Sequence, residues 1–211
     1  MVKMILHKYI LCTKLLMPKN ANSYFLVIFT YHFYHFRYSP LNAMRAVIQR
    51  VKNASVSVND SVVCEIGRGI LVLIGLSRRD TETDMKYIVR KILNIRLFPS
   101  PDGTRRWDKS VKDLNLEILC VSQFTLYSEL KGNKLDFHCA MDPKLSKDMY
   151  SQLVDQIKKN YTEDKVKDGI FGAVMDVSLI NDGPVTITLD SNPDINRNIT
   201  SDPCDSKNQD V

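Results

Sequence analysis

The chain has 211 residues, with 29 Lys and Arg against 24 Asp and Glu. Its formal charge of +5 comes from residues 1–43, which hold five basic residues and no acidic one, because the two signs balance from Met44 onward. A balanced body excludes a polybasic nucleic-acid-binding module, so any contact with nucleic acid is expected from a local patch. The five cysteines form no C-x-x-C, and no Cys or His pair has zinc-finger spacing. We therefore expect no metal site, no cofactor and a reducing, cytoplasmic compartment.

Residues 1–43 are aromatic-rich and mildly basic, and we exclude them from the fold. Their apolar stretch, Tyr24–Phe36, is shorter than the ~20 residues that a membrane span needs and contains two histidines. No transmembrane helix and no membrane partner are expected. Three interpretations stay open: a targeting peptide, which the lack of acidic residues favours, a mis-assigned start with translation from Met44, and a folded appendage.

The next hundred residues alternate strand-like and helix-like patterns. Short β-branched strands are predicted over residues 46–51, 54–58 and 62–66, and the apolar run 69–75 predicts a strand buried on both faces. Thr81 and Asp84 have the spacing of a capping box. The residues after them are apolar at positions 85, 88, 89, 92 and 93, which predicts an amphipathic helix that ends before a turn at 99–103.

The second half continues with a buried strand over residues 116–121, a loop around 132–134 and a helix over 144–161. Strands are predicted at 173–180 and 185–189, on either side of a Gly183-Pro184 corner. Residues 192–211 are polar, which predicts a disordered tail. About seven strands in consecutive groups with two helices predict an α+β fold of mostly antiparallel sheets.

Two polar segments stand at the ends of apolar strands, where a rigid scaffold presents groups to a ligand. One is Ser122-Gln123-Phe124-Thr125-Leu126, and the other is Asn181–Thr186 with its Gly-Pro step. Backbone at a glycine approaches ligands closely, and an X-Pro bond becomes cis at a cost of roughly 0.5–1 kcal/mol. The second segment is therefore a candidate binding element made of main chain.

Familiar catalytic patterns do not occur. There is no G-x-S-x-G, no H-E-x-x-H, no Walker loop and no dinucleotide fingerprint. From Met44 onward the chain has a single histidine, His138, with no sequence hint of a triad partner. We expect a site that works without a metal, a catalytic triad or a nucleotide cofactor.

Together with residues 45–51, Arg-Ala-Val-Ile-Gln-Arg-Val, and with Lys109-Ser110, both segments resemble the D-aminoacyl-tRNA deacylase (D-tyrosyl-tRNA(Tyr) deacylase) family. The resemblance covers residues 44–191. It implies a homodimer with a barrel-like core, two packed helices and an active site at the dimer interface. It also implies hydrolysis of the D-aminoacyl-tRNA ester, and of glycyl-tRNA mischarged on tRNA(Ala), as a proofreading step based on chirality.

An aminoacyl ester is activated, so placement of the ester and oxyanion donors suffice. The resemblance implies that Ser122, Gln123 and Phe124 line the site and present these donors. Thr125 is either a nucleophile or a residue that orients the substrate. We favour orientation, because a threonine hydroxyl without an adjacent base is a poor nucleophile.

The family pattern implies further binding residues. Gly183 and Pro184 would form a cis peptide that reaches into the partner's pocket and rejects L-side chains, with Arg50 bracing it. Phe137 and Met141 would lie near the terminal adenosine of the tRNA, and an aromatic ring holds an unpaired base by stacking. Leu135 stands where the family usually has proline, which loosens this loop. Lys131 and Lys134 are candidate tRNA phosphate contacts.

Two alternative functions remain. One is the DNA-binding replication accessory role assigned to some animal relatives, which a short, mildly acidic tail does not favour. The other is a deacylase that removes L-alanine from a mismatched tRNA. A trans Gly183-Pro184 peptide would indicate the second, and the sequence Asn181-x-Gly183-Pro184-Val185-Thr186 is closer to the D-specific pattern.

Overall fold

The computed structural model describes residues 43–191. The predictions made for residues 1–42 and for the tail 192–211 concern residues outside this range. No helix in the described range is long and apolar enough to cross a membrane.

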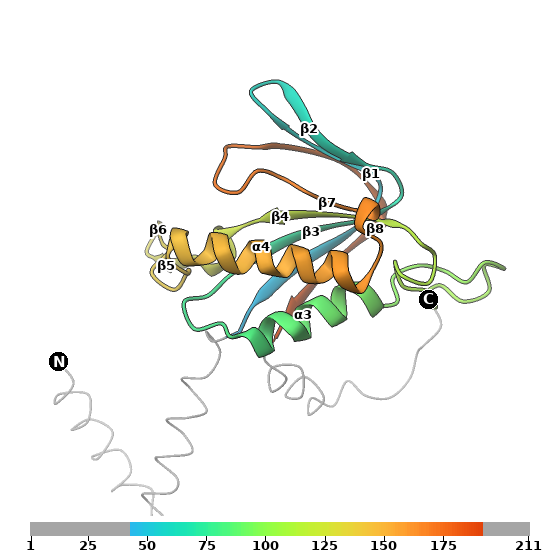
Figure 1. The fold of residues 1–211 in the computed structure, drawn as a ribbon, viewed down its shortest axis with the longest axis horizontal. Coiled ribbons are helices and arrows are strands. Elements are labelled where there is room, and N and C mark those ends of the chain that lie inside the picture. The colour runs from blue at the N-terminus through green and yellow to red at the C-terminus, as the bar shows by residue number, and fades with distance from the viewer. Residues whose placement is uncertain (1–42, 192–211) are drawn as a thin grey trace, which may run out of the picture. The chain divides into compact units, whose positions relative to one another are not determined.

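One mixed sheet carries most of the strands. Its order is β2-β1-β3-β4-β7, and β8 pairs with β1, while β5 and β6 form a separate hairpin (Figure 1). The strands are β1 (Arg45–Val58), β2 (Ser61–Ile66), β3 (Gly69–Gly75), β4 (Glu117–Ser122), β5 (Glu129–Lys131), β6 (Lys134–Asp136), β7 (Val166–Asp168) and β8 (Asp176–Asp190). The helices are α3 (Glu82–Asn94) and α4 (Pro143–Asn160), with the 3₁₀ turns η1 (Phe124–Tyr127) and η2 (Glu163–Lys165).

Strand β1 organises the sheet, because it pairs antiparallel with three other strands. Its first half pairs with β3, its second half pairs with β2, and β8 pairs with most of its length. The sequence predicted two strands here, whereas the structure has one. The pairing with β8 shifts register between Arg50 and Asn53, and this irregularity interrupts the alternation of buried and exposed residues that the two-strand prediction followed.

Strands β3, β4 and β7 are parallel neighbours. Parallel neighbours need long crossover connections, and α3 and α4 lie in them. The prediction of mostly antiparallel pairing therefore holds for the strands around β1 and fails for this part of the sheet. The continuous apolar runs of β3 and β4, which are buried along most of their length, are typical of parallel strands covered on both faces.

Helix α3 begins as the sequence predicted. The Thr81 hydroxyl accepts a hydrogen bond from the N–H of Asp84, and the Asp84 carboxylate accepts one from the N–H of Thr81. This capping box satisfies two of the N–H groups that a helix start leaves unpaired. The buried stripe of the helix is also the predicted one: Met85, Ile88, Val89, Ile92 and Leu93.

Two hydrophobic clusters cover the two faces of the sheet. Both helices lie on the same face (Figure 1), and the larger cluster packs between them and β1, β3 and β4. The smaller cluster lies on the other face, where β2 and β7 also come into contact. It consists of Val51, Ala54, Val56, Ile66, Leu71, Leu119 and Val121. The sheet is therefore nearly closed into a barrel, as the family resemblance implied.

Strand β8 differs from the prediction of two strands, 173–180 and 185–189, on either side of a corner. Residues on both sides of the Gly183-Pro184 step pair with β1, so the step interrupts one long strand and does not turn the chain back. Residues 182–184 have no partner in the β1 register, so this segment is not part of the hydrogen-bonded pairing between β8 and β1. The mistake came from taking a Gly-Pro step in a strand pattern as a corner.

Candidate active site

The first predicted segment begins where β4 ends. Ser122 lies opposite Ile74 of β3, and the N–H of Gln123 donates to the Ile74 carbonyl at 2.7 Å. The chain then enters η1, whose first two residues are Phe124 and Thr125. The first N–H groups of a helical turn have no partner within it. Because the N–H of Gln123 is engaged in the sheet, the candidate oxyanion donors at this edge are those of Phe124 and Thr125.

The side chain of Thr125 contacts an amide and no base. Gln123 Nε2 donates to Thr125 Oγ1 at 2.5 Å, and this is the only hydrogen bond of that hydroxyl within the described residues. A donor directed at the oxygen cannot remove its proton, so the arrangement orients the hydroxyl without activating it. The geometry favours the orienting role over the nucleophilic one.

Two of the predicted aromatic residues meet in space. The rings of Phe124 and Phe137 lie edge to face with centroids 5.0 Å apart, although Phe137 follows the β5–β6 hairpin and Phe124 follows β4. Phe124 is 58% exposed, so the pair presents aromatic surface to solvent. The N–H of Met141 donates to the Leu76 carbonyl at 2.9 Å, which ties the segment after Phe137 to the end of β3.

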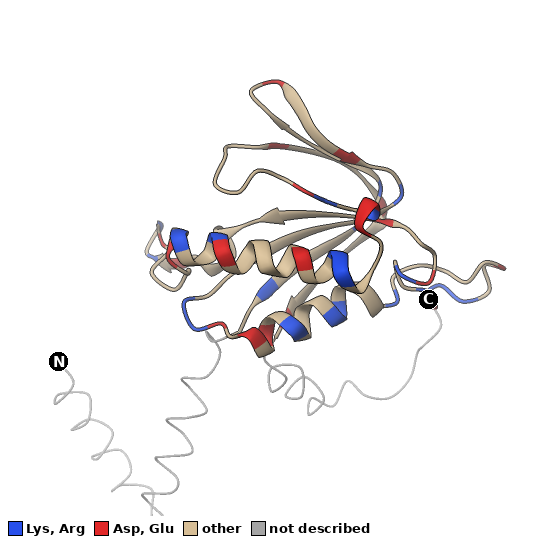
Figure 2. Ribbon diagram, in the orientation of Figure 1, with Lys and Arg blue, Asp and Glu red and all other residues tan. Residues whose placement is uncertain are grey.

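The two predicted phosphate contacts differ in their surroundings. Lys131 and Lys134 are both exposed and lie on opposite strands of the hairpin. Lys131 forms an ion pair with Asp136, which lowers the pKa of that carboxyl through their hydrogen bond. Lys134 forms no ion pair within residues 43–191. Figure 2 shows that Lys and Arg are interspersed with Asp and Glu along the rest of the ribbon.

The second segment has the expected backbone form. The Gly183-Pro184 peptide is cis, and Gly183 has φ 129°, a region that L-residues with side chains rarely adopt. A Cβ at this position would lie 2.9 Å from Cγ2 of Val185 and 3.0 Å from Nη2 of Arg50. Both the backbone angle and the space therefore require glycine here.

Arg50 holds this segment as predicted. Its Nε donates to the carbonyl of Asp182 at 3.0 Å and lies 3.3 Å from the Asp182 carboxylate, while Nη1 donates to the carbonyl of Leu97 at 2.5 Å. The guanidinium also lies over the rings of Phe98 and Trp107. An arginine held from several sides keeps the chain next to Gly183 in place.

Within one chain, however, the two predicted segments lie far apart. Through the sheet register, Ser122 is level with Leu189 of β8, whereas Val185, beside the Gly-Pro step, is level with Ile118. Four residue steps along the strands (~13 Å) and three strand spacings of ~4.8 Å therefore separate Ser122 from Val185. One chain does not bring the predicted site residues into one pocket.

The sequence did not reveal what fixes η1. Arg45 Nη1 donates to the carbonyl of Leu126 at 3.0 Å, and its guanidinium lies 5.0 Å from the ring centre of Tyr127. Tyr127 is buried, donates to the carbonyl of Ala43, and burial raises the pKa of its phenol. Gly75 allows the close approach, because a Cβ there would lie 2.9 Å from Cβ of Leu126. None of these contacts leaves a periodic signal in sequence.

Known proteins are similar to this chain in sequence and in fold. The profile described as D-Tyr-tRNA(Tyr) deacylase matches residues 47–190. A D-aminoacyl-tRNA deacylase of Dictyostelium discoideum is 57% identical over 148 residues, which cover 70% of this chain and 98% of that protein. A D-aminoacyl-tRNA deacylase of Drosophila melanogaster is 56% identical over 148 residues, covering 70% and 92%.

A solved structure described as the c-Myc DNA unwinding element binding protein superposes with a TM-score of 0.67. It is 51% identical in sequence, and the match covers 69% of this chain and 97% of that one. The resemblance seen in the sequence is thereby confirmed over the part of the chain that contains both candidate segments.

Proposed function

Because this chain belongs to the D-Tyr-tRNA(Tyr) deacylase family, we propose that it hydrolyses the ester bond of D-aminoacyl-tRNA to free D-amino acid and tRNA. Relatives more than half identical along almost their whole length carry the name of this activity. Two structural elements support the proposal: the first N–H groups of η1, which have no partner within the turn, and the main-chain segment at Gly183-Pro184. We expect the reaction in the cytoplasm, where aminoacyl-tRNA is used.

The distance between these two elements within one chain is the observation from which we infer how the site is assembled. A pocket that uses both must take Ser122–Thr125 from one protomer and Gly183-Pro184 from another. We infer a homodimer with two such sites. In a closed dimer the same two surfaces meet twice, so each protomer contributes both elements. Exposed apolar side chains, among them Ile180 on β8 and Val174 just before it, provide surface for such a contact.

The mechanism follows from main-chain groups. In the inferred dimer the N–H groups of Phe124 and Thr125 stabilise the oxyanion that forms when water attacks the ester, while Thr125 orients the substrate. The Gly183-Pro184 segment of the partner subunit stands where an L-side chain would project, so it admits D-residues and also glycine. Phe137, beside Phe124, receives the terminal adenosine by stacking, a contact worth roughly 1–3 kcal/mol per base.

The direct test compares D-Tyr-tRNA with L-Tyr-tRNA as substrates of the full chain. We expect rapid release of D-tyrosine and stable L-Tyr-tRNA. Glycyl-tRNA(Ala) serves as a third substrate, and it should be hydrolysed because glycine has no side chain to reject. Equal stability of the D- and L-esters, in the presence of folded protein, would refute the proposal.

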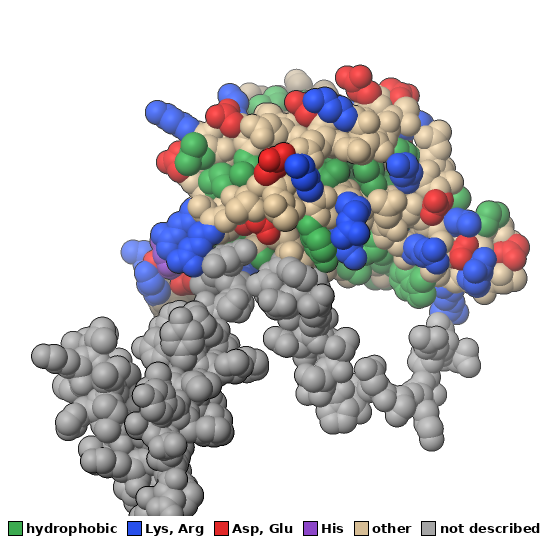
Figure 3. Space-filling view, turned by 60° about the horizontal axis from the view of Figure 1, so that its bottom comes forward, with side chains coloured by type: hydrophobic (Ala, Val, Ile, Leu, Met, Phe, Trp, Pro, Cys, Tyr) green, Lys and Arg blue, Asp and Glu red, His purple; other side chains and the backbone are tan. Residues whose placement is uncertain are grey.

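A second candidate is DNA binding, which the name of the 51% identical structure favours. Basic and acidic residues balance from Met44 onward, and phosphate binding needs a surplus of basic groups. Figure 3 shows one concentration of Lys and Arg at the end of the molecule that carries the β5–β6 hairpin. Binding of duplex DNA at physiological salt, together with inertness toward both esters, would favour this function over the first.

A further inference from the structure

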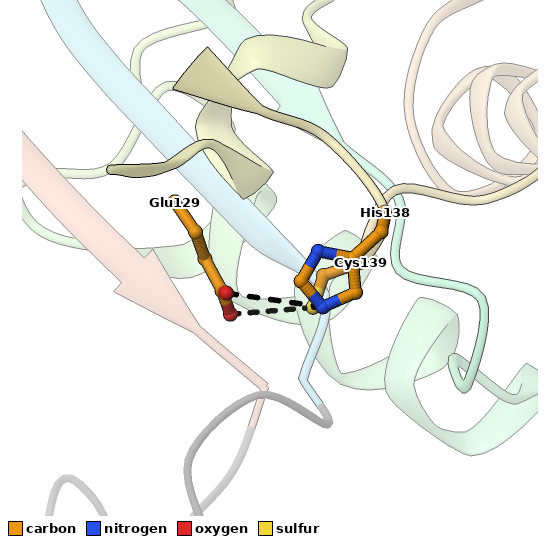
Figure 4. Close-up of side chains that lie close together, drawn as sticks. All are labelled: Glu129, His138 and Cys139. Atoms are coloured by element: carbon orange, nitrogen blue, oxygen red, sulfur yellow. Dashed lines mark hydrogen bonds and ion pairs between the residues drawn. The ribbon is translucent and has the colours of Figure 1, made fainter. Parts of the chain in front are cut away.

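Three side chains around the β5–β6 hairpin converge on one point that the proposed reaction does not use. Glu129 opens β5, while His138 and Cys139 follow β6, so the hairpin brings the three together (Figure 4). Cys139 Sγ lies 3.3 Å from His138 Nε2 and 3.4 Å from Glu129 Oε1, and His138 Nε2 lies 3.8 Å from Glu129 Oε2. Within residues 43–191, this is the one group of three such side chains close enough to hold a metal ion.

These separations match the edges of a zinc tetrahedron. With bonds of ~2.0–2.3 Å to oxygen, nitrogen and sulfur, neighbouring ligand atoms of tetrahedral Zn²⁺ lie roughly 3.3–3.6 Å apart. The Sγ–Nε2 and Sγ–Oε1 separations lie within this range. Glu129 faces Cys139 through one carboxylate oxygen and His138 through the other, so a rotation of the carboxylate would bring a single oxygen toward both. The ligand types, a thiolate, an imidazole and a carboxylate, are those that Zn²⁺ takes in proteins.

The histidine is already oriented for this role. Its Nδ1 lies 2.8 Å from Oδ1 of Asp136, and the same oxygen accepts a hydrogen bond from the N–H of His138 at 2.9 Å. A carboxylate on one ring nitrogen directs the other nitrogen toward a metal and raises its basicity. His138 Nε2 accordingly faces Cys139 and Glu129 (Figure 4). Cys139 is only 6% exposed, which shields its sulfur from solvent.

We propose that Glu129, His138 and Cys139 bind one Zn²⁺ ion per chain, with water in the fourth position. Binding releases the proton of the Cys139 thiol, because the thiolate is the ligand. The ion would join the first residue of the hairpin to the segment that follows it. Phe137 precedes His138 directly, so the same bond network would hold its ring against Phe124.

The sequence alone predicted no metal site, because His138 and Cys139 are adjacent and Glu129 is nine positions before His138, which is not a zinc-finger spacing. The site depends on the hairpin, which folds the chain back at Gly132 and Asn133. The inference does not rest on the proposed activity, since metal binding is measured without any tRNA.

The first test is a titration of the metal-free full chain with Co²⁺, which replaces Zn²⁺ and reports its ligands by absorption. We expect a thiolate-to-cobalt charge-transfer band, tetrahedral d–d bands and their loss when one equivalent of Zn²⁺ is added. A titration of the wild-type chain that gives only the spectrum of hydrated Co²⁺ would overturn the proposal, and this result requires no variant to fold.

Matched variants locate the site. Cys139→Ser and Glu129→Gln should lower zinc affinity at least tenfold, and Asp136→Asn should lower it by about ten- to a hundredfold with all three ligands intact. Cys64→Ser, in β2, is the control and should keep wild-type binding. Circular dichroism establishes folding of each variant. Unchanged zinc binding in folded Cys139→Ser and Glu129→Gln, or equal loss in Cys64→Ser, would contradict the assignment.

Discussion

Arg50 donates a hydrogen bond from Nε to the main-chain carbonyl of Asp182 at 3.0 Å, which fixes the chain directly before the Gly183-Pro184 step. The same side chain reaches the Leu97 carbonyl, so β1 connects the loop after α3 to the candidate chirality filter. Because the arginine side chain is only 13% exposed, these bonds are largely protected from competing water.

Lysine in place of Arg50 keeps the charge and loses the planar fork that makes several bonds at once. We expect Arg50→Lys to lower kcat/KM for D-Tyr-tRNA about ten- to a hundredfold, from the loss of a charged hydrogen bond worth roughly 1.5–3 kcal/mol. Steady-state deacylation checks this, with Arg90→Lys on the exposed side of α3 as the control. Wild-type kinetics in folded Arg50→Lys would show that the brace is dispensable.

Alanine at Gly183 should damage the site more than it damages the fold. The new Cβ must occupy a strained φ and crowd Val185 and Arg50, so the Gly-Pro segment has to move. We expect a loss of deacylation of at least about tenfold with the helix content unchanged by circular dichroism. Gly103→Ala is the matched control, since it has φ 73° with nothing within 4 Å of a Cβ. Similar activity of the two variants would contradict the close approach.

Replacing Thr125 by valine removes the hydroxyl while keeping the β-branched shape. If Thr125 orients the substrate, as its contact with Gln123 indicates, kcat should fall by less than about a hundredfold, the loss of one or two hydrogen bonds. A nucleophile would behave differently, because no covalent route would remain. Single-turnover deacylation of D-Tyr-tRNA measures the chemical step, and complete loss of that step in a folded variant would assign the nucleophilic role.

Asp80 should make stability fall as pH rises. Burial raises the pKa of its carboxyl from 3.8 to about 7, and the nearby carboxylates of Asp84 and Asp190 add to this effect. The folded protein therefore keeps a proton that the unfolded chain releases near pH 3.8. As the pH rises from 3.8 to about 7, the free energy of unfolding therefore falls. The ionised form is disfavoured further because Oδ1 has no hydrogen-bond partner within the described range.

The variant Asp80→Asn cannot ionise and should lose this dependence. Its Tm relative to wild type should rise steadily as pH increases from about 4 to about 7. Thermal denaturation followed by circular dichroism at several pH values measures the difference. Asp155→Asn, at an exposed position on α4, should show no such trend. A difference between Asp80→Asn and wild type that stays constant with pH would indicate an ordinary pKa for Asp80.

Local patterns predicted the local structure well. The capping box of Thr81 and Asp84 and the buried stripe of α3 appear as expected, since both depend on residues within a few positions of one another. Pairing partners are not local, so the parallel neighbours β3, β4 and β7 and the continuity of β8 were missed. A Gly-Pro step breaks the strand pattern in the same way whether the chain turns or continues.

In the candidate site, too, some contacts were expected from the sequence and others depend on non-local structure. Arg50 beside Gly183-Pro184 was expected from the family resemblance, and the structure places them in contact. The contact between Phe137 and Phe124 was not expected from the sequence. The engagement of the Gln123 N–H by Ile74 depends on sheet register, which the sequence does not encode in any short segment. The cluster of Glu129, His138 and Cys139 likewise needs the hairpin to form first.

The shared site is tested most directly by a dimer that carries one defect in each protomer. Gly183→Ala chains and Thr125→Pro chains, the second of which disturbs the start of η1, are co-expressed with different tags, and the mixed dimer is purified through both. Each parent dimer should keep no more than about a tenth of the wild-type activity on D-Tyr-tRNA. The mixed dimer should recover about half of the wild-type activity, because one of its two sites combines the intact segments. A mixed dimer as inactive as its parents would contradict a site built from two chains.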